Sequence, residues 1–202
     1  MRTAFVPLLV LVAACAAKDP APRAGFDPVV GKVDQGADLI GKTPPPLGVH
    51  WLDGEPADAG KVRLVRWWTD GCALCSNSAV AIAAMQRKHG DKLSVRAIHH
   101  NKQPGRVPTD DDIRQLANTA GYTQGLARDP QWKALRAWWL DAGDRQFTSV
   151  TFLLGKQGRI RLIHTGGEFH AREHTQQCLF DPAQCAAEYT AIDTAITQLV
   201  NE

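Results

Sequence analysis

The chain has 202 residues, of which 44% are hydrophobic and 22% charged, and its 23 basic and 21 acidic residues give a net charge of +2. This composition excludes a disordered tail, a collagen-like repeat and a coiled coil, while the length suits one domain of about 150–170 residues with a tail. Nucleic-acid binding depends on a basic excess that this chain lacks, so we expect no nucleic-acid partner.

The first residues predict an export signal. A basic start is followed by an eleven-residue apolar run, Ala4–Ala14. A helix that crosses a membrane needs about 20 residues, whereas a short apolar run that ends on small residues is typical of a secretory signal peptide. The signal peptide is therefore predicted over residues 1–14.

The residues Val12-Ala13-Ala14-Cys15 resemble a bacterial lipobox. This resemblance implies lipidation of Cys15 and a membrane anchor made of several acyl chains, because a single chain binds membranes only marginally. Ala16, rather than an aspartate, after the cysteine implies the outer membrane of a Gram-negative bacterium, with the chain facing the periplasm. An ordinary signal peptide that is cut elsewhere is the alternative.

The rest of the chain divides into a tether and a domain. Residues 15–38 are rich in alanine, proline, glycine and charge and show little periodicity, so they predict a flexible, lipidated tether. Residues 39–202 are predicted to form the folded domain. Within it, residues 49–52 predict a short strand and residues 62–68, which are mostly apolar, a strand in the centre of a sheet.

A long helix is predicted over residues 72–89, where apolar side chains recur at helical spacing. Residues 93–98 predict another strand. Thr109 is the expected N-cap of a second helix. Asp129 and Pro130 form an N-cap and a proline at the first helical position, which predicts a third helix from this point. Its expected hydrophobic residues are Trp132, Leu135, Trp138 and Trp139.

The last elements predict a β-hairpin and a helix. Residues 150–154 and 159–164 read as strands joined by a turn. Asp181 and Pro182 predict the start of a final amphipathic helix. This order of elements predicts one α/β domain with a mixed central sheet and helices on both of its faces.

Cys72 and Cys75 form a Cys-x-x-Cys pair at the junction of a strand and a helix. The free N–H groups and the dipole at a helix N-terminus favour a thiolate at Cys72. Cys75, one turn inside the helix, is then held in place to resolve a mixed disulfide. The pair therefore predicts thiol–disulfide exchange, with Cys72 attacking and Cys75 resolving.

The stretch Val62–Cys75, followed by a helix, resembles the thioredoxin fold, especially TlpA-like envelope thiol–disulfide oxidoreductases of the redoxin family. Residues 150–160 resemble the strand–turn–strand of the same family, and the resemblance covers about residues 40–200. It implies a thioredoxin-like fold, catalysis by Cys72 and Cys75, no bound cofactor, and a protein thiol or disulfide as partner. The substrate loop that it implies consists of Trp68, Gly71, Ser149 and Val150.

The sequence departs from the family pattern near the cysteines. Gly71 replaces the tryptophan that often precedes the first cysteine, no proline stands between the cysteines, and Ser78 replaces an acidic residue. Ser149 stands where the family has a cis-proline that presents backbone to a bound peptide. Because that proline is missing, metal has easier access to the thiols, and a copper- or zinc-binding module that uses Cys72, Cys75 and a histidine is the alternative function.

Two further cysteines, Cys178 and Cys185, flank the start of the last predicted helix. In an oxidising compartment they predict a structural disulfide, which would stabilise the fold by about 2–2.5 kcal/mol through loop closure. The alternative is a zinc site made of all four cysteines, those at 72, 75, 178 and 185. A third possibility for the whole chain is a binding domain whose cysteines are only structural.

The histidines suggest two weaker signals. His170 opens an H-x-x-E-H sequence, the inverted zinc-protease motif, but its surroundings predict a solvated loop rather than a helix. His170, His174 and Cys178 are also spaced four residues apart, which suggests a metal-binding site. His99 and His100 end a predicted strand, where we expect a polar strand end.

Overall fold

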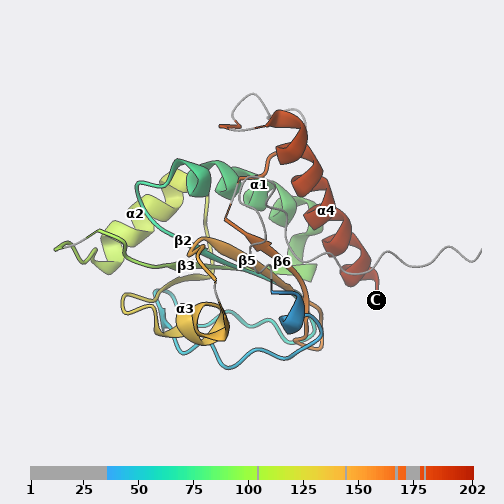
Figure 1. The fold of residues 1–202 in the computed structure, drawn as a ribbon, viewed down its shortest axis with the longest axis horizontal. Coiled ribbons are helices and arrows are strands. Elements are labelled where there is room, and N and C mark those ends of the chain that lie inside the picture. The colour runs from blue at the N-terminus through green and yellow to red at the C-terminus, as the bar shows by residue number, and fades with distance from the viewer. Residues whose placement is uncertain (1–35, 104, 144, 167, 172–177, 180) are drawn as a thin grey trace, which may run out of the picture.

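A six-stranded mixed sheet forms the centre of the structure (Figure 1). The structure is a computed structural model that describes residues 36–103, 105–143, 145–166, 168–171, 178–179 and 181–202. The order of the strands across the sheet is β1-β4-β3-β2-β5-β6. Their bounds are β1 His50–Trp51, β2 Val62–Trp68, β3 Leu93–His99, β4 Leu126–Arg128, β5 Val150–Leu154 and β6 Ile160–Thr165.

Helices cover both faces of this sheet, as predicted (Figure 1). One hydrophobic core lies between the sheet and the helices α1, α2 and α4, and a second lies on the opposite face with α3. The bounds are α1 Ala73–His89, α2 Asp110–Ala120, α3 Lys133–Trp138 and α4 Pro182–Asn201, with short 3-10 helices at Ala37–Leu39, Gly90–Lys92 and Leu140–Ala142.

The strand β2 lies in the middle of the sheet, as its apolar sequence predicts. It pairs in parallel with β3 and antiparallel with β5. The carboxyl ends of parallel strands meet at one edge of a sheet, so Trp68 and His99, which are register partners, lie side by side there. The turn that leads from β2 to Cys72 and the helix α1 begins at this edge.

Local capping signals account for the helix starts that were predicted well. Thr109 is the N-cap of α2 and forms a capping box with Asp112, and Gly121 ends the helix with a φ of 102°. Asp181 caps α4, and Pro182 occupies the first helical position. These signals lie within the sequence of each helix, so they act independently of the rest of the fold.

The predicted third helix is present, but its predicted start at Asp129 and Pro130 is wrong. The helix α3 begins only at Lys133, after Trp132, whose φ is 58°. The Asp129 carboxylate accepts a hydrogen bond from the backbone N–H of Leu135 at 2.8 Å, and the indole of Trp132 donates to the carbonyl of Asn101. Asp129 therefore caps an N–H in the first turn of α3 from a position three residues before the N-cap, and Trp138 and Trp139 are buried as expected.

The short strand β4 was also missed. Its three residues, 126–128, pair with β3 in parallel and with β1 antiparallel. Three residues are too few to show the alternation of apolar and polar side chains that predicts a strand. The pairing with β3 and β1, rather than the local sequence, makes this segment a strand.

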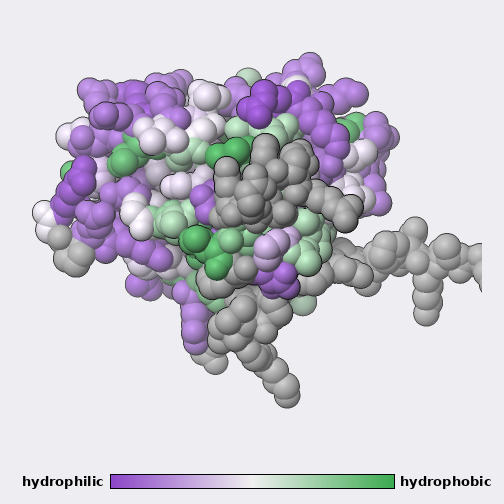
Figure 2. All heavy atoms as spheres, turned by 90° about the horizontal axis from the view of Figure 1, so that it is seen from above, coloured by the Kyte–Doolittle hydropathy of each residue, from purple (hydrophilic) through white to green (hydrophobic). Residues whose placement is uncertain are grey.

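The signal peptide over residues 1–14, the lipidation site Cys15 and most of the tether lie outside the described residues, and they stay predictions. The last tether residues are described: Asp38 forms an ion pair with the buried Arg145. Within the described ranges, no helix combines the length and the apolar character needed to cross a membrane. On the face seen from the side of α1 and α4, hydrophilic residues gather along the upper and left sides of the view, and hydrophobic residues lie near its middle (Figure 2).

Candidate active site

The Cys72–Cys75 pair lies where the chain passes from β2 into α1. Cys72 is the N-cap of α1, with extended backbone, and its Sγ accepts a hydrogen bond from the backbone N–H of Cys75 at 3.2 Å. The two cysteines are joined by a disulfide, with 5.2 Å between their Cα atoms. Cys72 is partly exposed, whereas only 1% of Cys75 is exposed. One sulfur can therefore be reached from outside, and the other is protected.

The start of α1 supplies hydrogen-bond donors near Cys72 and no acidic side chain in its first turn. The nearest acidic residue in sequence, Asp70, is bound elsewhere: its two oxygens lie 3.1 Å from the Nε2 atoms of His99 and Gln103. Burial lowers the pKa of His99, and Asp70 partly opposes that shift.

Ser149 contacts the second sulfur directly. Its Oγ lies 3.0 Å from Sγ of Cys75, and because a disulfide sulfur carries no proton, the hydroxyl is the donor. The backbone carbonyl of Ser149 accepts a hydrogen bond from Gly166 at 2.7 Å, which fixes this residue just before β5. The described residues contain no cis peptide bond. At the position where the resembled family has its proline, a hydroxyl therefore faces the disulfide.

The structure explains why glycine stands at 71. Gly71 has a φ of 69°, in the left-handed region that a side chain with a Cβ rarely adopts. A Cβ placed there would meet nothing closer than Nε2 of Gln103, at 3.6 Å. The constraint is thus backbone conformation rather than space, and it disfavours a tryptophan at this position.

The four residues of the expected substrate loop occupy different environments. Gly71 is exposed, and Ser149 contacts Cys75, as described above. Trp68 and Val150 are buried; the indole of Trp68 packs on His99, with 4.9 Å between ring centroids. Contact of these four residues with a partner stays a prediction.

Comparisons with known proteins support the architecture. Neither a family model nor a curated protein matches the sequence. Among solved structures, a putative thiol:disulfide interchange protein DsbE from Chlorobium tepidum is 21% identical, with a TM-score of 0.53 over 78% of this chain and 97% of that one. A thiol:disulfide interchange protein from Bacteroides sp. is 12% identical, with a TM-score of 0.55 over 81% and 91%. The fold is thioredoxin-like.

This thioredoxin-like fold buries an arginine that sequence reasoning did not single out. Arg66 lies in β2 and is fully buried; its Nη1 donates to Oγ1 of Thr151 at 3.0 Å, while Nε and Nη2 have no hydrogen-bond partner. Burial lowers its pKa, and burial also raises the pKa of the neighbouring Tyr122 to about 12. The sequence could have predicted a buried arginine here. Arg63 and Arg66 are three residues apart, so in a strand their side chains point to opposite faces. A strand whose two faces are both covered cannot expose both side chains.

His99 is the last residue of β3, and His100 follows it. Both side chains are buried, which corrects the expectation of a polar strand end. Neither ring nitrogen of His100 has a hydrogen-bond partner. Burial, with smaller contributions from Lys102 and His99, lowers the pKa of His100 to about 3. His100 is therefore a neutral imidazole at physiological pH.

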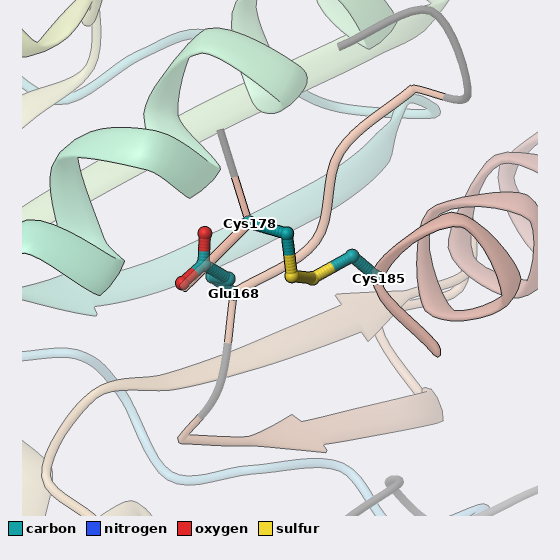
Figure 3. A group of neighbouring side chains, drawn as sticks. All are labelled: Glu168, Cys178 and Cys185. Carbon is teal, nitrogen blue, oxygen red and sulfur yellow. A yellow bond between two sulfur atoms is a disulfide. The ribbon is translucent and has the colours of Figure 1, made fainter. Parts of the chain in front are cut away.

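The second cysteine pair, Cys178 and Cys185, forms a disulfide beside a buried carboxylate (Figure 3). Glu168 follows β6, and its carboxylate accepts hydrogen bonds from the side chain of Asn77 and the backbone of Leu179, both at 3.0 Å. Nε2 of His170 lies 2.9 Å from the same carboxylate. Sequence reasoning missed Glu168, because only the fold brings it to the cysteines.

The structure tests the metal sites that the sequence suggests as alternatives. Within the described ranges, the four cysteines do not form one ligand cluster, so the alternative of a four-cysteine zinc site is wrong. No histidine or carboxylate of the described residues joins Cys72 and Cys75 in such a cluster. His170 is buried rather than in a solvated loop, while residues 172–177 of that motif lie outside the described residues. The described residues bring together one set, formed by Glu168, Cys178 and Cys185.

Proposed function

We propose that the chain is a thiol–disulfide oxidoreductase that acts on protein partners through Cys72 and Cys75. The observation that carries the proposal is the asymmetry of the pair. Cys72 is accessible and is the N-cap of α1, with its sulfur bound by a backbone N–H, whereas Cys75 is buried behind it.

In the reductive direction, the Cys72 thiolate attacks one sulfur of a partner disulfide. The partner's other sulfur leaves as a thiolate and takes up a proton, and a mixed disulfide joins Cys72 to the partner. Cys75 then loses its proton and attacks Sγ of Cys72, which expels the partner's remaining sulfur. The partner gains two electrons and two protons, and the Cys72–Cys75 disulfide forms. The same steps in reverse oxidise a partner dithiol.

The surrounding groups suit each step. The N–H donor and helix N-terminus favour the thiolate that attacks, and they also make Cys72 a good leaving group. The Ser149 hydroxyl, 3.0 Å from the Cys75 sulfur, can stabilise the charge that appears there during resolution. These steps involve protein groups only, so the proposal requires no bound cofactor.

Two further lines support the proposal and its setting. The similar solved structures include proteins named as thiol:disulfide interchange proteins. From the predicted signal peptide and lipobox we propose that the domain lies in the cell envelope of a Gram-negative bacterium, facing the periplasm and anchored in the outer membrane through lipid on Cys15. The substrate loop formed by Gly71 and Ser149, with Trp68 and Val150 behind them, is part of this proposal.

The test compares single cysteine variants of the full chain in the reduction of a protein disulfide. We expect Cys72→Ser to abolish catalysis, and Cys75→Ser to accumulate a mixed disulfide with the substrate because the resolving thiol is missing. The matched control is Cys178→Ser, which removes a cysteine of the other pair. Full activity in Cys72→Ser, or no mixed disulfide in Cys75→Ser, would contradict the proposal.

A further inference from the structure

We propose that Cys178, Cys185 and Glu168 form a zinc site when the Cys178–Cys185 disulfide is reduced. One ligand atom from each of these residues lies within 4.8 Å of the others (Figure 3). The three residues come from three different segments: the turn after β6, the segment before α4, and the first turns of α4 itself. The site shares no residue with the Cys72–Cys75 pair, and the inference does not depend on the proposed exchange activity.

The carboxylate is already held in place for a ligand role. Glu168 is buried, and its oxygens accept hydrogen bonds from Asn77 on α1 and from the backbone of Leu179, with His170 beside them. Carboxylates that ligate metals are typically oriented by such outer hydrogen bonds. A carboxylate offers about four lone-pair positions, so the three contacts leave room for a cation.

The charge balance around Glu168 favours a cation after reduction. Among the described residues, no lysine or arginine forms an ion pair with Glu168; its only partner of that kind is His170. Reduction adds two thiols next to this buried carboxylate. Glu168 and Cys185 are buried and Cys178 is partly exposed. Ionising both thiols without a counter-ion would put three negative charges close together, two of them on buried residues, which is unfavourable. A divalent cation removes this penalty and lets both thiols act as thiolate ligands.

The donor set selects zinc. Two thiolates with one carboxylate suit Zn²⁺, which accepts sulfur and oxygen ligands in tetrahedral geometry, whereas Ca²⁺ and Mg²⁺ prefer oxygen alone. Three protein ligands leave the fourth position to water. Zinc–sulfur bonds of about 2.3 Å at a tetrahedral angle separate the two sulfurs by about 3.8 Å. Sulfurs joined in a disulfide cannot reach this separation, so reduction controls access to the site.

The reaction balances with a dithiol as reductant. The dithiol passes two electrons and two protons to the Cys178–Cys185 bond and itself becomes a disulfide. Cys178 and Cys185 become thiols, and binding of Zn²⁺ releases their two protons. Removal of the metal and oxidation of the two thiols restore the original state. The site therefore links metal binding to the redox state of the chain.

The test uses the full chain with Cys72→Ser and Cys75→Ser, so that only the second pair of the domain can respond. It is titrated with Zn²⁺ against a chromophoric chelator, without oxygen, before and after reduction with a phosphine. We expect one zinc bound per chain in the dithiol state and none in the disulfide state. Co²⁺ in place of Zn²⁺ should give the visible absorption of a tetrahedral thiolate complex.

Two variants probe the carboxylate. Glu168→Gln should weaken zinc binding by more than about a hundredfold, and Asn77→Ala, which removes one orienting donor, by about tenfold. The matched control is Glu188→Gln, because Glu188 is another buried carboxylate beside a histidine, 2.8 Å from Nε2 of His164. This control should bind zinc as tightly as the parent chain.

Three outcomes would overturn the proposal: no stoichiometric zinc in the reduced chain, equal affinity in Glu168→Gln and Glu188→Gln, or the same zinc affinity in the disulfide state. Thermal unfolding of each variant shows whether it is folded. If Glu168→Gln does not fold, the tenfold loss in Asn77→Ala decides the role of the carboxylate, and unchanged affinity there contradicts the proposal.

Discussion

The two disulfides of this chain both lie at the start of a helix, yet the groups around them differ. Cys72 precedes α1 as its N-cap and receives a backbone N–H, and a serine hydroxyl contacts its partner. Cys185 lies in the first turn of α4, and its disulfide lies beside the buried carboxylate of Glu168, with ligand atoms of the three residues within 4.8 Å of one another. The sulfurs of the first pair contact a backbone N–H and a hydroxyl group, whereas those of the second pair lie near a carboxylate.

This difference decides which pair suits exchange. Hydrogen-bond donors favour a thiolate, whereas a nearby carboxylate disfavours it and favours either the disulfide or a cation. A helix N-terminus alone therefore does not make a cysteine reactive. The side chains that the fold brings to the sulfurs determine whether a pair exchanges electrons, stabilises the structure or binds metal.

The largest expected effect is the loss of unfolding free energy when the Cys178–Cys185 disulfide is removed, with exchange activity unchanged. The Cys178–Cys185 disulfide closes a loop of eight residues, since the two lie seven apart, and loop-closure entropy assigns it about 2.5 kcal/mol. We expect the double variant Cys178→Ser/Cys185→Ser to lose about this much free energy of unfolding, measured with urea, while it keeps its exchange activity. The comparison fails if this variant is as stable as the parent chain, or if it is folded but inactive.

The next largest effect concerns the loss of stability in acid that the buried His100 causes. His100 titrates with a pKa of about 3 in the folded chain and near 6.5 when unfolded. The unfolded state therefore takes up a proton first as pH falls, and stability decreases below pH 6.5. Between pH 7.5 and pH 5 the expected loss is about 2 kcal/mol.

We expect His100→Leu to lack this part of the pH dependence. The measurement is the free energy of unfolding by urea at several pH values, compared as a slope so that a constant effect of the substitution cancels. If the variant and the parent chain lose the same free energy between pH 7.5 and pH 5, His100 does not control acid stability.

Much of the fold follows from local sequence signals. The apolar run of β2 and the caps at Thr109 and Asp181 predict elements that the structure confirms. The start of α3 was missed, because the Asp129 side chain binds the N–H of Leu135, a choice that depends on tertiary packing.

The site divides in the same way. The spacing of Cys72 and Cys75 places both in one helical turn, so sequence alone predicts their proximity. Ser149 contacts Cys75 across 74 residues, and Asn77 contacts Glu168 across 91. Such contacts arise from strand pairing and helix packing, so a single sequence carries no local signal for them.

A smaller effect concerns the reactivity of the two accessible cysteines. In the fully reduced chain at pH 7, with a chelator present to exclude zinc, we expect Cys72 to be alkylated about tenfold faster than Cys178. An acidic thiol at Cys72 accounts for about threefold after its lower nucleophilicity is included, and the carboxylate near Cys178 for about as much again. Mass spectrometry of the peptides measures both rates. Glu168→Gln should bring the alkylation rates of Cys72 and Cys178 closer together. Equal rates for the two cysteines in the parent chain would contradict the proposed difference between the two pairs.

The smallest effect concerns the hydroxyl that faces Cys75. In the dithiol state the Cys75 thiol can donate to the Ser149 hydroxyl as well as accept from it, whereas a disulfide sulfur can only accept, so the contact stabilises the reduced form more. Removing it in Ser149→Ala should cost the reduced form about 1 kcal/mol, which is about fivefold in the equilibrium with glutathione and lowers the reduction potential by about 20 mV. Ser78→Ala is the matched control, because the buried Ser78 donates to the carbonyl of Leu74 at 2.7 Å. A shift of equal size in both variants would show that loss of a buried hydroxyl, rather than its contact with the sulfur, changes the potential.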